Sequence, residues 1–172
     1  MALKQFASFF IGENLFGVDI RLIREINRNI DITPVDGAPD FVRGLLNLRG
    51  QIVTVIDVGV RMGLRAIEDR KDNCRCIVLK TSDELSGKYD ESQDIENTSR
   101  DLVALYVDGI GDMVTLDEKQ IEPPPANIGE LEGKYIQGIA RTEKDFLILL
   151  KMSELLLYSH EDHTRKVEKE IC

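Results

Sequence analysis

Apolar residues fall in short runs separated by turn-forming residues along most of the chain. The runs cover residues 6–11, 15–20, 51–58, 74–80, 102–107, 111–116, 135–141 and 146–150. Short runs bounded by Gly, Pro and Asn are typical of β-strands. We therefore expect an all-β fold of about eight to ten short strands with little helix.

Turn residues between neighbouring runs predict three hairpins. The first joins 6–11 to 15–20, the second joins 102–107 to 111–116 around Asp108-Gly109, and the third joins 135–141 to 146–150. Residues 21–26 fit a helical turn and a strand equally well. Residues 153–158 predict a short helix that packs back on the body.

Residues 42–58 combine small residues, apolar pairs and one cation. Gly44, Asn47 and Gly50 separate the apolar pairs, and Arg49 stands just before a strand. Glycine is needed where the backbone takes a positive φ or passes close to another segment. The pattern predicts a tight corner that feeds a strand and presents an arginine.

The strand at 51–58 is apolar on both faces, so both its surfaces should be covered. Two small barrels packed together would cover them. We expect one domain over residues 1–158 with two β-barrel subdomains, approximately 1–65 and 66–150. The C-terminal segment of the domain is expected to pack back on the first subdomain. A polar tail, 159–172, follows.

The segment at 81–101 is the least apolar part of the sequence. It carries seven acidic residues against two basic ones. Such a composition predicts an exposed and mobile loop.

The net charge of −9 disfavours nucleic acid and anionic membranes as partners, since no basic stripe offsets it. The N-terminal residues lack the apolar core of a secretory signal, and no window is long and apolar enough to span a bilayer. We expect a cytoplasmic protein that does not insert into the membrane, with its three cysteines reduced.

Neither catalysis nor metal binding fits the residue pattern. The two histidines, His160 and His163, lie in the polar tail, far from any triad. Cys74 and Cys76 lack the second pair that a four-ligand zinc site requires. On a strand both thiols face the same side, which favours core packing. We expect no catalytic residue, no metal and no cofactor.

Arg49 is open to two interpretations. It can be a surface cation that only braces the turn. Alternatively, its planar guanidinium, beside an apolar corner, can hold the carbonyl or carboxylate groups of a protein partner.

Several motifs resemble the CheW family, the coupling proteins of bacterial chemotaxis. The most specific segment runs through residues 38–44 and 47–50 to 56–58, and further matches follow at 107–112, 120–123, 135–138 and 146–150. The resemblance covers nearly the whole chain. It implies two SH3-like five-stranded β-barrels, packed side by side with short helices, in a protein without enzymatic activity.

The resemblance also implies partners. A CheW protein joins the cytoplasmic tip of transmembrane chemoreceptors to the regulatory domain of the histidine kinase CheA, at receptor arrays on the inner face of the membrane. Carried over by position, the receptor-binding residues are Ile23, Glu25, Gly44, Leu48, Arg49 and Cys76. The kinase-binding residues are Ile26, Val42 and Arg43 in the first barrel, with Glu122 and Asn127 in the second.

This sequence departs from the family pattern at two places. The segment 81–101 is longer than the family's compact turn. Glu122 stands where the resemblance leads us to expect a basic residue. Two alternatives stay open: an adaptor for a parallel CheA-like pathway that does not control swimming, and a β-barrel that binds a small ligand or a metal.

Overall fold

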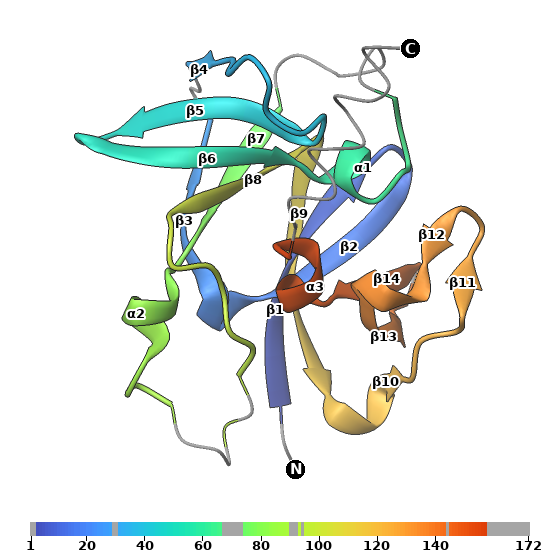
Figure 1. The fold of residues 1–172 in the computed structure, drawn as a ribbon. Helices are drawn as coiled ribbons and strands as arrows, with labels where there is room; N and C mark the ends of the chain where they lie inside the picture. The colour runs from blue at the N-terminus through green and yellow to red at the C-terminus, as the bar shows by residue number, and fades with distance from the viewer. Residues whose placement is uncertain are drawn as a thin grey trace.

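A computed structural model describes residues 3–28, 31–66, 74–89, 93, 95–143 and 145–157. Its strands form two six-stranded sheets and one small two-stranded ribbon (Figure 1). The polar tail at 159–172, with both histidines, lies outside the described residues. The all-β prediction is confirmed, although each sheet has six strands rather than five.

Sheet 1 combines strands from both ends of the chain in the order β10-β13-β14-β2-β1-β9. Its strands are β1 (Leu3–Ile11), β2 (Asn14–Asp19), β9 (Gly109–Asp117), β10 (Ile121–Glu122), β13 (Ile136–Arg141) and β14 (Phe146–Leu150). The β14 and β2 strands pair in parallel, and the other neighbours pair antiparallel. The ribbon of β11 (Asn127–Ile128) and β12 (Leu131–Glu132) follows β10.

Sheet 2 comes from the middle of the chain in the order β3-β7-β8-β6-β5-β4. Its strands are β3 (Ile23–Asn27), β4 (Ile32–Thr33), β5 (Val42–Leu48), β6 (Gln51–Asp57), β7 (Arg75–Leu79) and β8 (Val103–Val107). Short helical turns connect the strands: η1 (Ile20–Leu22), α1 (Val58–Arg61), α2 (Ser82–Leu85), η4 (Glu118–Gln120), η5 (Gly133–Tyr135) and α3 (Met152–Leu155).

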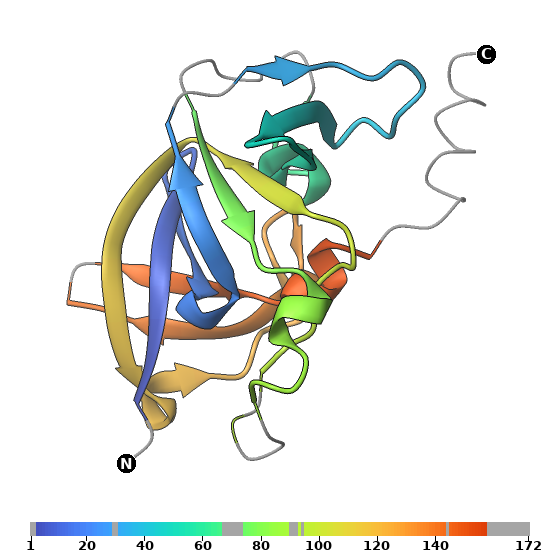
Figure 2. The ribbon, with the colours of Figure 1, turned by 90° about the vertical axis from the view of Figure 1, so that its left-hand side faces the viewer.

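The expected division into consecutive halves, about 1–65 and 66–150, does not match the sheets. Since β9 pairs with β1 and β14 pairs with β2, the last strands of the chain return to the sheet that the first two began. In Figure 1 the blue β2 lies beside the orange β14, and in Figure 2 the yellow β9 runs beside the blue β1. The sheet 2 barrel is therefore inserted between the two parts of the sheet 1 barrel.

Two of the three predicted hairpins are confirmed, β1–β2 and β13–β14. The predicted hairpin around Asp108 is wrong, because β8 pairs within sheet 2 while β9 pairs with β1 of sheet 1. Asp108 instead marks a crossing between the barrels. The ambiguous residues 21–26 divide between the end of η1 and most of β3.

The segment at 81–101 is more ordered than its composition predicts, in the part that the structure describes. Thr81 and Glu84 form a capping box at the start of α2, and Leu85 is buried. Tyr89 and Ile95 pack against the main core. A few apolar residues are thus enough to tie an acidic segment to the body.

The largest apolar cluster lies between the two sheets and holds them together. It joins Phe9 and Phe16 of sheet 1 to Ile77, Leu79 and other residues of sheet 2. Full burial of each such side chain contributes about 1.5–3 kcal/mol. Strand β7 serves two cores, since its alternate residues enter a second cluster inside the sheet 2 barrel. This arrangement explains why β7 is apolar on both faces.

Candidate functional site

The predicted corner is the tip of the β5–β6 hairpin. Arg49 has a φ of 50° and Gly50 a φ of 85°. The Gly50 N–H donates to Oδ1 of Asn47 over 3.0 Å, which fixes the turn. Of the four residues from which the sequence predicts a tight corner, Asn47, Arg49 and Gly50 form it, whereas Gly44 lies within β5. The turn leaves the Arg49 side chain exposed.

Arg49 reaches across the barrel to β3. Its Nη2 donates to Oε2 of Glu25, yet 70% of the Arg49 side chain stays exposed, against 23% for Glu25. The hydrogen bond from Arg49 lowers the pKa of Glu25. The arginine is held in place from one side and presents the rest of its guanidinium to solvent.

A second set of polar contacts lies beside the first. Nη1 of Arg24 donates to Oε1 of Gln51 over 3.3 Å, and Nη2 of Arg24 pairs with Glu84 of α2. Partial burial alone would raise the pKa of Glu84, but hydrogen bonds from Arg24 and Thr81 lower it. We call Arg24, Glu25, Arg49, Gln51 and Glu84 the corner site. It ties the hairpin tip to β3 and α2.

Two exposed apolar side chains are sequence neighbours of corner-site residues. Ile52 is 70% exposed and Ile26 is 41% exposed, while the predicted residues Ile23 and Leu48 are half-buried. We expected the whole 51–58 strand to be covered, and Ile52 is not, because it lies at the hairpin tip beyond the core. Sequence reasoning missed Ile52 as a surface residue of this site.

Two predicted receptor-binding residues lie behind the surface. Gly44 is buried with a φ of 150°, and a Cβ there would stand 2.3 Å from the carbonyl oxygen of Thr33. Cys76 is fully buried, and burial raises the pKa of its thiol to about 12, so the thiol stays neutral. Because both residues are buried, neither Gly44 nor the Cys76 side chain can contact a partner in this conformation. Both residues shape the barrel beneath the corner site.

The predicted kinase-binding residues fall in two separate places. In the sheet 2 barrel, Ile26 is exposed, Val42 is half-buried, and the guanidinium of Arg43 lies 4.9 Å from the centroid of the Tyr106 ring. Glu122 and Asn127 are exposed on β10 and β11, and these two strands lie far from the tip of the β5–β6 hairpin in Figure 1. The structure does not bring the two groups together.

A buried ion pair, which the sequence did not reveal, joins the two barrels. Nη1 of Arg65 lies 2.7 Å from Oδ1 of Asp108, Nη2 of Arg65 reaches Oδ2, and each side chain is 9% exposed. Oδ2 of Asp108 also accepts the Gly12 N–H over 2.7 Å. The pair raises the pKa of Arg65, so its charge is permanent. Asp108 thereby links the β1–β2 turn to the segment after α1.

The described residues hold neither a metal-binding cluster nor a membrane-spanning helix. No cluster of three or more His, Cys, Asp or Glu side chains suited to a metal occurs among the residues that the structure describes. No helix in the described part of the chain is long and apolar enough to cross a membrane. The polar groups of the corner site pair with one another and leave a cation and apolar side chains facing outward.

Known proteins share sequence with most of this chain. A family model described as a CheW-like domain matches residues 5–159. Chemotaxis protein CheW of Klebsiella aerogenes is 29% identical over 153 residues, covering 89% of this chain and 81% of that protein. Chemotaxis protein CheW of Treponema pallidum is 28% identical over 151 residues, covering 88% and 81%.

A solved structure shares the architecture. The crystal structure of the scaffolding protein TtCheW from Thermoanaerobacter tengcongensis superposes with a TM-score of 0.74 at 26% identity, covering 92% of this chain and 95% of that one. The fold is thus that of a scaffold built from two SH3-like β-barrels. The chain belongs to the CheW family, whose members are scaffold or adaptor proteins of chemotaxis and not enzymes.

Proposed function

We propose that the protein couples transmembrane chemoreceptors to the histidine kinase CheA by binding both at once. It would work in the cytoplasm and be recruited to receptor arrays at the inner face of the membrane. Membership of the CheW family supports this role. The observation that carries it is Arg49, exposed beside apolar residues and held from behind by Glu25.

The receptor tip would bind at the corner site. Apolar surface around a fixed arginine is the usual composition of a protein interaction hot spot. Arg49 would donate to carbonyl or carboxylate groups of the receptor, while Ile52, Ile23 and Leu48 supply apolar contact. Gly44 and Cys76 act indirectly, by setting the path of β5 and the packing of β7.

The regulatory domain of CheA would bind the same barrel through Ile26, Val42 and Arg43. Glu122 and Asn127 on the other barrel provide a second contact. Two contacts on different barrels allow one adaptor to bridge two kinase molecules. For the adaptor to transmit a signal, it must bind the receptor and kinase states with unequal affinity, because equal affinity shifts no equilibrium.

A pull-down with a receptor signalling fragment tests the receptor surface. Truncating a hot-spot residue costs on the order of 1–3 kcal/mol of binding free energy, so Arg49→Ala should weaken receptor binding about tenfold or more. Lys119→Ala, which removes an exposed cation from the other barrel, is the matched control. Arg49→Ala binding as tightly as this control would rule out the assignment.

A further inference from the structure

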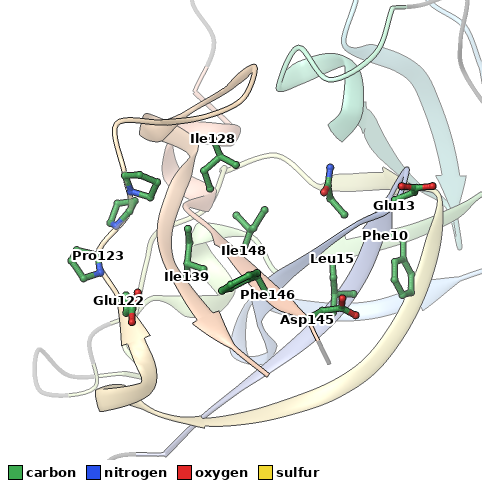
Figure 3. Close-up of a pocket in the computed structure, with 13 residues that line it drawn as sticks. Phe10, Glu13, Leu15, Glu122, Pro123, Ile128, Ile139, Asp145, Phe146 and Ile148 are labelled. Atoms are coloured by element: carbon green, nitrogen blue, oxygen red, sulfur yellow. The ribbon is translucent and has the colours of Figure 1, made fainter. Parts of the chain in front are cut away.

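A groove of about 650 Å³ opens on the sheet 1 barrel, away from the corner site (Figure 3). Ile139 of β13 and Ile148 of β14 lie in its middle. The prolines at 123–125 form one wall, and Phe10 of β1 stands on the opposite side. Its size and its mostly apolar lining are those of a binding groove.

A second hollow, of about 670 Å³, continues the groove along β9. The two hollows share Phe10, Leu15 and Asp145, and the second is lined further by residues 111–115. We call the two hollows together the acidic trough. The shared residues make the two hollows neighbours, with the second on the β9 side.

Large apolar side chains are exposed along the acidic trough. Met113 is 59% exposed, Phe146 58% and Phe10 39%, and all three line it. Single exposed apolar residues need no explanation, but several in one depression mark an interaction site.

Every charged side chain among the described residues that line the acidic trough is negative. The first hollow is lined by Glu13, Glu122 and Asp145, and the second adds Asp112 and Glu143. No Lys, Arg or His is among the described residues that line either hollow. These carboxylates repel anionic partners and attract cationic ones.

Arg141, next to the acidic trough, already makes a cation–π contact with Phe146. The guanidinium carbon of Arg141 lies 5.5 Å from the centroid of the Phe146 ring. A cation at this distance interacts favourably with the face of the ring. A guanidinium or ammonium group of a partner would find the same chemistry on Phe10, between Glu13 and Asp145.

The walls of the acidic trough are already fixed. The Thr142 N–H donates to the Asp145 carbonyl oxygen over 2.8 Å, and the Asp145 N–H donates back to Oγ1 of Thr142 over 3.1 Å. Asp108 holds the Gly12 N–H in the turn that carries Glu13. A prearranged surface loses little conformational entropy when it binds.

We propose that the acidic trough binds an extended basic and apolar segment of a protein partner. Its Lys or Arg side chains would face the carboxylates, and its apolar side chains would cover Phe10, Met113 and Phe146. Two adjoining hollows offer more room than a compact small molecule fills, which favours an extended chain. The inference rests on the proposed function in one respect, that the segment belongs to a signalling protein. The basic and apolar chemistry of the segment follows from the acidic trough alone.

Binding of matched synthetic peptides tests the proposal. The probes are a peptide of alternating leucine and lysine and its leucine–glutamate counterpart, followed by fluorescence anisotropy and by amide chemical shifts of the full chain. The lysine peptide should bind at least about tenfold more tightly, and the shifts should map to the acidic trough. Phe146→Ala, at an exposed position that the fold does not need, should weaken binding several-fold.

Charge variants separate this site from general attraction to an acidic protein. The triple variant Glu13→Gln, Glu122→Gln and Asp145→Asn should weaken the lysine peptide about tenfold or more. The control Asp36→Asn, Asp83→Asn and Asp101→Asn removes the same charge from exposed positions elsewhere and should change binding less than about twofold. Equal losses in both variants would overturn the proposal.

Two further outcomes complete the test. Phenethylamine serves as a small cationic aromatic probe. If it shifts the resonances of the acidic trough and the lysine peptide does not, the trough is a small-molecule site and the proposal fails. The trough variants should keep full receptor binding through Arg49. If the wild type binds the lysine peptide but does not couple receptor to kinase, the proposed function fails and this inference stands.

Discussion

Two arginine–carboxylate pairs of the sheet 2 region use the same chemistry in opposite surroundings. Arg49 and Glu25 meet at the hairpin tip, where the arginine is 70% exposed. Arg65 and Asp108 meet between the barrels, where each side chain is 9% exposed. The exposed pair leaves most of its arginine available, whereas the buried pair is enclosed by the fold.

The difference separates binding from folding. An exposed ion pair contributes about 0–1 kcal/mol to stability, since water screens it. Breaking a buried pair costs about 3–5 kcal/mol, because it leaves an uncompensated charge in the interior. The fold therefore depends on Arg65 and hardly on Arg49, which leaves Arg49 available for a partner.

The largest effect is expected from breaking the buried pair. Arg65→Ala leaves the Asp108 carboxylate without its arginine, and the free energy of unfolding should fall by about 3–5 kcal/mol in urea titrations. A double variant, Arg65→Met with Asp108→Leu, should lose less because neither partner of the pair is left behind as an uncompensated charge. A loss below about 1 kcal/mol for Arg65→Ala would show that the two pairs are equivalent.

A backbone change inside the hairpin should have an intermediate effect. Gly44→Ala places a Cβ against the Thr33 carbonyl oxygen, at a φ that L residues rarely adopt. We expect a loss of roughly 1–3 kcal/mol in unfolding free energy. Gly37→Ala is a useful comparison, because that glycine also has a positive φ but no neighbour within 4 Å. Equal losses at both positions would mean that the close approach at Gly44 carries no cost of its own.

Removing the exposed arginine should barely affect stability. Arg49→Ala should lower the unfolding free energy by less than about 1 kcal/mol, and high salt should shrink this loss further. The loss from Arg65→Ala should be nearly independent of salt, because that pair is shielded from solvent ions. Urea titrations at low and high salt measure both. A large, salt-independent loss for Arg49→Ala would assign it a structural role instead.

The smallest expected effect is a shift in one titration. Glu25 has a pKa below its ordinary value of 4.5 because Arg49 donates to its carboxylate. Its contribution to stability is therefore present above about pH 4.5 and is lost as the pH falls through the lowered pKa. In Arg49→Ala the pKa of Glu25, followed by side-chain NMR, should rise toward the ordinary value. An unchanged pKa would mean that the ion pair does not form in solution.

The local structure of the hairpin could be predicted because its causes are local. Asn47, Arg49 and Gly50 form a turn through their own backbone preferences and one side-chain hydrogen bond. The shared, core-facing side of Cys74 and Cys76 could likewise be read from their spacing of two. Where neighbouring residues decide the conformation, the pattern was sufficient.

The topology could not be predicted because its causes lie far apart in the chain. Asp108-Gly109 has the composition of a hairpin turn, yet contacts to Gly12 and Arg65, distant in sequence, make it a crossing between sheets. The burial of Cys76 and Gly44 depends on the same long-range packing. The acidic trough also escaped prediction, since β1, β9, β13 and β14 build it from separate parts of the chain.

Co-sedimentation of the adaptor with a receptor signalling fragment and CheA, with kinase activity recorded in the same sample, tests the central claim most directly. The wild type should bring CheA into the receptor pellet and change its activity. Arg49→Ala, folded and stable, should lose about tenfold or more in receptor affinity and with it the change in kinase activity. A wild type that binds neither partner, or an Arg49→Ala variant that couples as well as the wild type, would contradict the account.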